Sequence, residues 1–216
     1  MKRLVIFDLD GTLLNTLGGI GAACNKMLAH YGFPQWGPDD YKIFIGNGTK
    51  KLIERALPAE RAADDAFVEE AKELYLQIYR GDLMAETAPY EGVPELLCAL
   101  RERGVALAVA SNKFDDGTKQ LIAHFFSEFE FAAVEGQKEG VAVKPDPTIV
   151  NDILHKAGVA VEDVLYVGDT GVDMRTAMNA GAESVGVTWG FRGHDELSAN
   201  GANHIISQPS EILSLV

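Results

Sequence analysis

The chain has 216 residues, of which 47% are hydrophobic and 24% charged, and its formal net charge at pH 7 is −13. This length supports one good core, or one core plus a small module. The strong negative charge disfavours nucleic acids and anionic membrane surfaces as partners. The two cysteines, Cys24 and Cys98, lie inside apolar helical patterns, which favours reduced thiols over a disulfide. With no signal peptide and no apolar run of membrane-spanning length expected, we predict a soluble cytoplasmic protein.

The first predicted strand, Leu4 to Phe7, is a short apolar run that ends at two aspartates. Asp8 and Asp10 leave its end together, and Gly11 allows a sharp turn just after them. Strand alternation places both carboxylates on the same side, where they repel each other unless a cation or a proton intervenes. The segment therefore indicates metal-assisted chemistry, with a capped and solvated turn as the simpler alternative.

The stretch from residue 15 to residue 88 has helical patterns and no strand pattern. Apolar residues at helical spacing predict one helix around Ile20 to Tyr31 and another around Phe67 to Ile78. We predict that residues 15–88 form an all-helical cap domain inserted into an α/β core made of residues 1–14 and 89–216. One continuous mixed domain is the alternative.

The remainder of the chain alternates apolar runs with helical patterns. Helices between the runs end at Gly104 and Gly158, which suit the left-handed conformation after a helix. This alternation predicts an α/β fold with a Rossmann-like parallel sheet. The predicted strands are Val105–Ala110, Phe129–Val134, Val164–Val167, Glu183–Val187 and His204–Ile206, the last followed by a helix over Pro209–Leu215.

Polar residues follow several of these strands. Ser111 and Asn112 end the second strand before a predicted helix, where a hydroxyl and free backbone N–H groups suit a phosphate oxygen. Lys144 precedes another helix and suits a phosphoryl oxygen. Asp169 and Asp173 follow the strand that ends at Val167 and offer the oxygen ligands that Mg²⁺ prefers. Taken singly, Ser111 is more typical of a helix cap and Lys144 of a solvated surface charge, and Asp173 suits the start of a helix as well as a metal site. Together, these residues share the edge where open α/β sheets place ligands.

These motifs, in this order, resemble the haloacid dehalogenase superfamily over essentially the whole chain. The matching segments are Asp8 to Leu13 (Asp-x-Asp-Gly-Thr-Leu), Ser111, Lys144 and Gly168 to Asp173 (Gly-Asp-x-x-x-Asp). The 15–88 insertion resembles the helical cap of subfamily I. The segments around Gly46, Pro89 and Gly186 to Arg192 resemble those of phosphoglycolate phosphatases.

The resemblance implies a role for each matching residue. Asp8 would be the nucleophile that forms an aspartyl-phosphate, and Asp10 would protonate the leaving alcohol and then activate water. Ser111 and Lys144 would hold the phosphoryl group. The implied Mg²⁺ ligands are Asp8, Asp10 through its main-chain oxygen, and Asp169, with Asp173 supporting the metal site; Gly11, Thr12 and Asn112 complete the substrate-binding set.

The expected function is therefore a Mg²⁺-dependent phosphatase acting on a small phosphate monoester of the phosphoglycolate type, as a monomer or homodimer. Pyrophosphate hydrolysis and sugar-phosphate hydrolysis or mutation on the same site are the enzymatic alternatives. A catalytically silent phosphate-binding module is the alternative of another class. Dehalogenation and phosphonate cleavage are disfavoured because the family members that perform them lack the acid at position 10. Asn15 stands where many relatives carry an acidic residue, and we expect it to affect cap motion or ligand choice.

Overall fold

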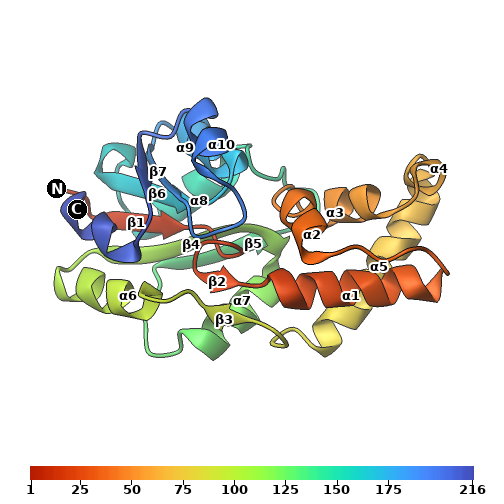
Figure 1. The fold of residues 1–216 in the computed structure, drawn as a ribbon. Helices are drawn as coiled ribbons and strands as arrows, with labels where there is room; N and C mark the ends of the chain where they lie inside the picture. The colour runs from red at the N-terminus through yellow and green to blue at the C-terminus, as the bar shows by residue number, and fades with distance from the viewer. The chain divides into compact units, whose positions relative to one another are not determined.

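The computed structural model describes all 216 residues, which divide into two compact units. One unit combines Met1–Asn15 with Ala88–Val216, and the other is the continuous stretch Thr16–Thr87. Figure 1 shows the course of the chain through both.

The first unit is built on a six-stranded sheet in the order β5-β4-β1-β6-β7-β8. Every neighbouring pair of strands is parallel, which confirms the predicted α/β class. From β1 the chain adds strands first on one side and then on the other, so β1 lies between β4 and β6 at the point where ligands bind in such sheets. The strands are β1 (Leu4–Phe7), β4 (Ala106–Phe114), β5 (Ala133–Gln137), β6 (Val164–Gly168), β7 (Glu183–Val187) and β8 (His204–Ile206).

Helices cover both faces of this sheet, as Figure 1 shows with α6 and α7 on one face and α8 and α9 on the other. All four residues of β1 are buried, as expected for a central parallel strand. On one face, Val150 and Ile153 of α8 and Ala177 of α9 join alternate strand residues in a single apolar cluster. The helices are α6 (Val93–Glu102), α7 (Asp115–Phe125), α8 (Thr148–Ala157), α9 (Gly171–Ala180) and α10 (His194–Ala199).

Two short segments pair where the chain leaves and re-enters this unit. β2 (Leu14–Asn15) and β3 (Ala88–Pro89) run antiparallel, with Leu14 opposite Pro89 and Asn15 opposite Ala88. The chain therefore departs and returns at adjacent points.

The second unit is entirely helical. Asp64 begins its longest helix, because the Asp64 carboxylate accepts hydrogen bonds from the N–H groups of Ala66 and Phe67. Buried Tyr41 donates to Asn25 at 2.6 Å. Its helices are α1 (Leu17–His30), α2 (Pro38–Phe44), α3 (Thr49–Ala56), α4 (Ala59–Ala62) and α5 (Asp65–Gly81).

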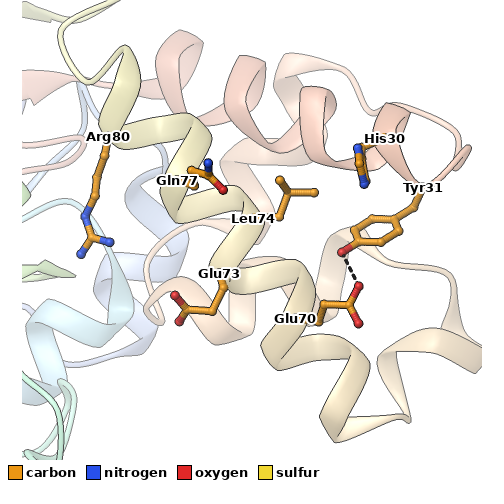
Figure 2. A pocket seen from close by; sticks show the side chains of 7 residues that line it. All are labelled: His30, Tyr31, Glu70, Glu73, Leu74, Gln77 and Arg80. Carbon is orange, nitrogen blue, oxygen red and sulfur yellow. Dashed lines mark hydrogen bonds between the residues drawn. The ribbon is translucent and has the colours of Figure 1, made fainter.

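An open surface groove lies along α1 and α5 within the helical unit (Figure 2). The Tyr31 hydroxyl donates to Glu70 at 3.0 Å across it, and Arg80 lies at its far end. Its remaining lining residues are His30, Glu73, Leu74 and Gln77. The lining mixes both signs of charge around one apolar side chain, so no single class of ligand is favoured.

Three local predictions differ from the structure. The strand predicted to start at Phe129 starts only at Ala133. The Phe129 ring instead packs against the Phe126 ring, with 6.3 Å between the two ring centroids. The helix predicted over Pro209–Leu215 is present as a 3₁₀ helix that ends one residue earlier, at Ser214. The second strand continues beyond Ala110 to Phe114, with an irregular register against β5.

Other expectations agree with the structure. Both cysteines are free thiols, as predicted. None of the helices combines the length and apolar character needed to cross a membrane.

Candidate active site

Three buried carboxylates meet at the ends of β1 and β6. The Asp8 N–H donates to the carbonyl of Val167 at 2.8 Å, which extends the pairing of these two strands by one residue. Asp169 directly follows β6, and Asp173 lies in the first turn of α9. One oxygen of each of the three carboxylates lies within 4.8 Å of the others, an arrangement that could hold a metal ion. Oxygen-only ligands of this kind suit a hard divalent cation.

Lys144 is buried beside this cluster. Its Nζ lies 3.0 Å from Asp8 and 2.8 Å from Asp173, and it also donates to the Ala110 carbonyl at 3.0 Å. Asn112 fixes its backbone, because the Asn112 side chain accepts from the Lys144 N–H at 2.8 Å and donates to the Lys144 carbonyl at 3.1 Å. Asn112, predicted to bind substrate, therefore contacts Lys144 in this structure.

The protonation equilibria reflect a crowded acidic cluster. Burial raises the pKa of Asp8 to about 7, although Lys144 opposes the rise. Burial and the charges of Asp173 and Asp8 raise the pKa of Asp169 well above its usual range. Burial alone would lower the pKa of Lys144, but the carboxylates of Asp173 and Asp8 raise it well above its ordinary value. The lysine thus stays charged, and the carboxylates gain from a further cation.

Asp173 both caps the start of α9 and belongs to the acidic cluster, the two roles that its position in the sequence suggested. Its Oδ2 accepts hydrogen bonds from the N–H and hydroxyl of Thr170, at 3.0 and 2.7 Å, at the start of α9. Its Oδ1 accepts from Lys144 and, at 3.4 Å, from the Tyr166 hydroxyl. The helix cap therefore orients a carboxylate of the acidic cluster.

Asp10 lies in a second charged pair. Its Oδ1 is 2.9 Å from the Nζ of Lys113, and both side chains are largely buried, with exposed fractions of 12% and 3%. Its carboxylate is not part of the three-carboxylate cluster. Sequence analysis missed Lys113; the available signal was a lysine inside the polar run that ends the second strand.

Gly11 and Thr12 lie against Asp169. Gly11 has φ +83°, and a Cβ there would lie 2.3 Å from an Asp169 oxygen, so glycine suits both the turn and the close approach. The Thr12 hydroxyl donates to Asp169 at 3.3 Å. Ser111 is buried within β4, where its Oγ accepts from the Lys113 N–H at 3.2 Å.

The loop after β7 holds the same region from the other side, which sequence reasoning did not anticipate. The Trp189 indole N–H donates to the Thr12 carbonyl at 3.1 Å, and the Phe191 N–H donates to Asp169 at 2.7 Å. Between them, Gly190 packs so closely that a Cβ would lie 2.3 Å from the Gly11 carbonyl oxygen. We call residues 188–192 the clasp loop. Its signal in the sequence was a glycine between two aromatic residues after a strand.

The arrangement thus joins all the predicted site residues within one unit. It holds four carboxylates and two buried ammonium groups, those of Lys113 and Lys144. Such a site can bind a divalent cation through the acidic cluster and keep an aspartate oxygen beside a charged lysine. These are the requirements for nucleophilic chemistry on an anionic substrate.

A model of the haloacid dehalogenase-like hydrolase family matches residues 5–187. The chain belongs to this family. The resemblance inferred from the sequence motifs is thereby confirmed, and the α/β core described above is the fold expected of a member.

Similar proteins include two phosphoglycolate phosphatases. The protein from Aquifex aeolicus is 31% identical over 99% of this chain and 96% of its own length. The protein from Pseudomonas putida is 32% identical over 99% of this chain and 79% of its own length. Among solved structures, a predicted phosphoglycolate phosphatase from Haemophilus somnus has a TM-score of 0.90 and 27% identity, covering 99% of this chain and 97% of its own. A predicted phosphatase from Clostridium acetobutylicum has a TM-score of 0.89 and 26% identity, covering 100% and 98%.

Proposed function

We propose that the chain is a Mg²⁺-dependent phosphatase that hydrolyses a small phosphate monoester through an aspartyl-phosphate on Asp8. The observation that supports this proposal is the buried cluster of Asp8, Asp169 and Asp173 with the Lys144 ammonium 3.0 Å from the Asp8 oxygen. The similarity to phosphoglycolate phosphatases supports 2-phosphoglycolate as the substrate.

In this mechanism the Asp8 carboxylate attacks phosphorus in line with the ester oxygen. Asp10 gives a proton to the leaving alcohol and then takes one from the water that hydrolyses the aspartyl-phosphate. Lys144 and Ser111 hold the phosphoryl oxygens while the bond to the leaving group breaks. Each displacement transfers the phosphoryl group to one new oxygen, so the products are the alcohol and inorganic phosphate.

The metal site supports this chemistry. Asp8, Asp169 and Asp173 would hold the cation, with the main-chain oxygen of Asp10 as a further ligand. Bound Mg²⁺ supplies positive charge that offsets the repulsion between the Asp8 carboxylate and the phosphate dianion. Without a cation, burial of the Asp8 and Asp169 carboxylates opposes their ionisation.

The proposal extends to the rest of the molecule. The helical unit Thr16–Thr87 serves as the cap domain that selects the leaving group, and Asn15, at its first junction, modulates cap motion or ligand choice. The enzyme acts in the cytoplasm as a monomer or a homodimer.

The test is phosphate release from a panel of phosphorylated metabolites that includes 2-phosphoglycolate, pyrophosphate and sugar phosphates, with Mg²⁺ or EDTA. We expect phosphate release that EDTA abolishes and added Mg²⁺ restores. Asp8→Asn should abolish turnover while its circular dichroism spectrum stays that of the parent. Normal turnover in Asp8→Asn would refute attack by Asp8, and an isomerised sugar phosphate without free phosphate would indicate a mutase.

A further inference from the structure

Tyr166 is a buried tyrosine beside the site that the mechanism above does not use. It belongs to the apolar cluster between the sheet and the helices α8 and α9, and its exposed fraction is 0%. A phenylalanine would fill such a position without a polar group, whereas a tyrosine hydroxyl costs free energy to bury unless it is hydrogen-bonded. The partners of the hydroxyl show what it does there.

The Tyr166 hydroxyl contacts two charged groups of the site. Its oxygen accepts a hydrogen bond from the Lys144 Nζ at 3.1 Å. The acceptors for its own proton are Asp173 Oδ1 at 3.4 Å and the Ala110 carbonyl oxygen at 3.5 Å. The Lys144 Nζ is 5.8 Å from the centroid of the tyrosine ring, so it lies beyond the hydroxyl end of the ring rather than over its face. The contact therefore depends on the hydroxyl, which phenylalanine lacks.

The Lys144 ammonium has more acceptors around it than donors to offer. An ammonium group carries three N–H donors. Four oxygens lie within reach of this one, those of Asp173 at 2.8 Å, Asp8 and Ala110 at 3.0 Å, and Tyr166 at 3.1 Å. The acceptors share the donors, so the balance among them sets the position of the ammonium relative to Asp8.

Tyr166 is the one acceptor of the four that is neither charged nor a backbone group. Without its hydroxyl, the three donors would be left to Asp8, Asp173 and the Ala110 carbonyl. Electrostatic attraction would then draw the ammonium toward the two carboxylates. In that position the ammonium would donate less well to a phosphoryl oxygen, which is the task of Lys144 in the proposed reaction.

We propose that Tyr166 is a positioning residue whose hydroxyl holds the Lys144 ammonium where it can contact both Asp8 and a phosphoryl oxygen. The inference rests on the proposed phosphatase function and adds to it a residue that acts through Lys144. It predicts a loss of turnover in a protein that still folds, because in Tyr166→Phe the ammonium keeps three acceptors for its three donors.

The test is the steady-state kinetics of Tyr166→Phe with saturating Mg²⁺, on the member of the substrate panel that the parent enzyme hydrolyses fastest. We expect kcat to fall about tenfold or more, the effect of losing one hydrogen bond to a charged group. KM should change less than kcat. Vanadate adopts the geometry of the displacement at phosphorus, so its inhibition of the variant should weaken by a similar factor.

Ser184→Ala is the matched control for the loss of a buried hydroxyl. Ser184, in β7, is also buried, and its hydroxyl donates to the Asn203 Oδ1 at 2.9 Å and accepts from the Asn203 N–H at 3.0 Å. This variant should lose stability in thermal unfolding and keep the kcat of the parent. Tyr166→Met, whose flexible side chain adapts to irregular space, replaces Tyr166→Phe if the phenylalanine variant does not fold.

The outcomes separate this inference from the proposed function. A folded variant without the hydroxyl that keeps the kcat of the parent, or that loses kcat while vanadate inhibits it as well as the parent, overturns the role of Tyr166 and leaves the phosphatase assignment intact. A parent enzyme that releases phosphate from no member of the panel overturns the phosphatase assignment and the inference with it. A fall in kcat together with weaker vanadate inhibition supports the inference.

Discussion

We expect substitution of single residues in the clasp loop to affect both the stability of the fold and the binding of metal. In Gly190→Ala the new Cβ would meet the Gly11 carbonyl oxygen at 2.3 Å and the Asp169 Cβ at 2.4 Å. Because both contacts are close to the backbone, the loop must shift. We expect the free energy of unfolding to fall by about 1–3 kcal/mol, the usual cost of overpacking, and Mg²⁺ binding to weaken, since Phe191 then holds Asp169 less well.

A glycine three residues away provides the control. A Cβ at Gly193 meets nothing within 4 Å, so Gly193→Ala should change the free energy of unfolding by less than about 0.5 kcal/mol. Urea unfolding measures the first effect and calorimetric titration with Mg²⁺ the second. Equal behaviour of the two variants would contradict the role assigned to the clasp loop.

Asp10 allows a second prediction at this scale. Asp10→Asn keeps the size of the side chain but removes its ability to give and take a proton, so kcat should fall on the order of 10² to 10⁴. Rapid-quench measurements should show slowed formation and slowed hydrolysis of the aspartyl-phosphate. A loss of less than about tenfold would remove Asp10 from general acid–base catalysis.

The sequence allowed prediction of those site residues whose chemistry appears directly after a strand. Asp8, Asp169 and Asp173 stand out because a buried apolar run ends in acidic residues, and parallel strands bring such ends together. Lys113 and Trp189 were missed for a physical reason. Their contacts, with Asp10 and with the Thr12 carbonyl, join segments remote in sequence, and no local pattern specifies which distant partner a lysine or an indole will meet.

At the scale of secondary structure, the start of α9 links helix stability to the site. The Thr170 hydroxyl donates to Asp173 at 2.7 Å in a buried position. Thr170→Val removes that donor without a change in shape and leaves a buried carboxylate with one partner fewer. We expect a loss of about 1.5–3 kcal/mol in the free energy of unfolding, the range for hydrogen bonds to charged groups.

Helix α8 offers the matched control. Thr148 also donates to an aspartate, Asp146, at the start of its helix, but Thr148 is exposed. Thr148→Val should therefore cost less than about 0.5 kcal/mol, because water replaces the lost hydrogen bond. Thermal unfolding of both variants gives the comparison, and a larger loss at Thr148 than at Thr170 would contradict the argument.

Element boundaries were predictable where helix and strand signals were local. Gly104 and Gly158 adopt the left-handed conformation after their helices, as their positions suggested. The start of β5 was not predictable, because the apolar residues from Phe129 onward fit a strand equally well. Phe129 leaves the sheet because its ring fills a space beside Phe126 that exists only in the folded structure.

At the scale of the whole molecule, the acidic cluster links the stability of the fold to the pH and to the binding of a metal ion. The folded protein without metal holds a proton on Asp8 up to a pKa of about 7, against 3.8 as the ordinary value. Between these values the folded state binds more protons than the unfolded state, so the contribution of Asp8 to stability falls as the pH rises. At the proposed metal site Mg²⁺ would compete with that proton, so its binding should strengthen over the same range.

We therefore expect the increase in Tm on adding Mg²⁺ to be larger at pH 8 than at pH 5.5. Differential scanning calorimetry with Mg²⁺ or EDTA at both pH values measures it, with Asp8→Asn as the control whose increase should depend less on pH. An increase in Tm that is the same at both pH values would show that metal and proton do not compete at Asp8.

The antiparallel pairing of β2 with β3 bears on how this chain could acquire new substrates. Opposed residues in such a pair have Cα atoms only about 5 Å apart. The insertion Thr16 to Thr87 therefore begins and ends at adjacent points of the α/β unit. A different inserted segment could replace Thr16–Thr87, or a few flexible residues could connect its two ends, without changing the order of the strands in the sheet. If the helical unit acts as the proposed cap, selectivity would then be exchanged as a module while the catalytic residues stay in place.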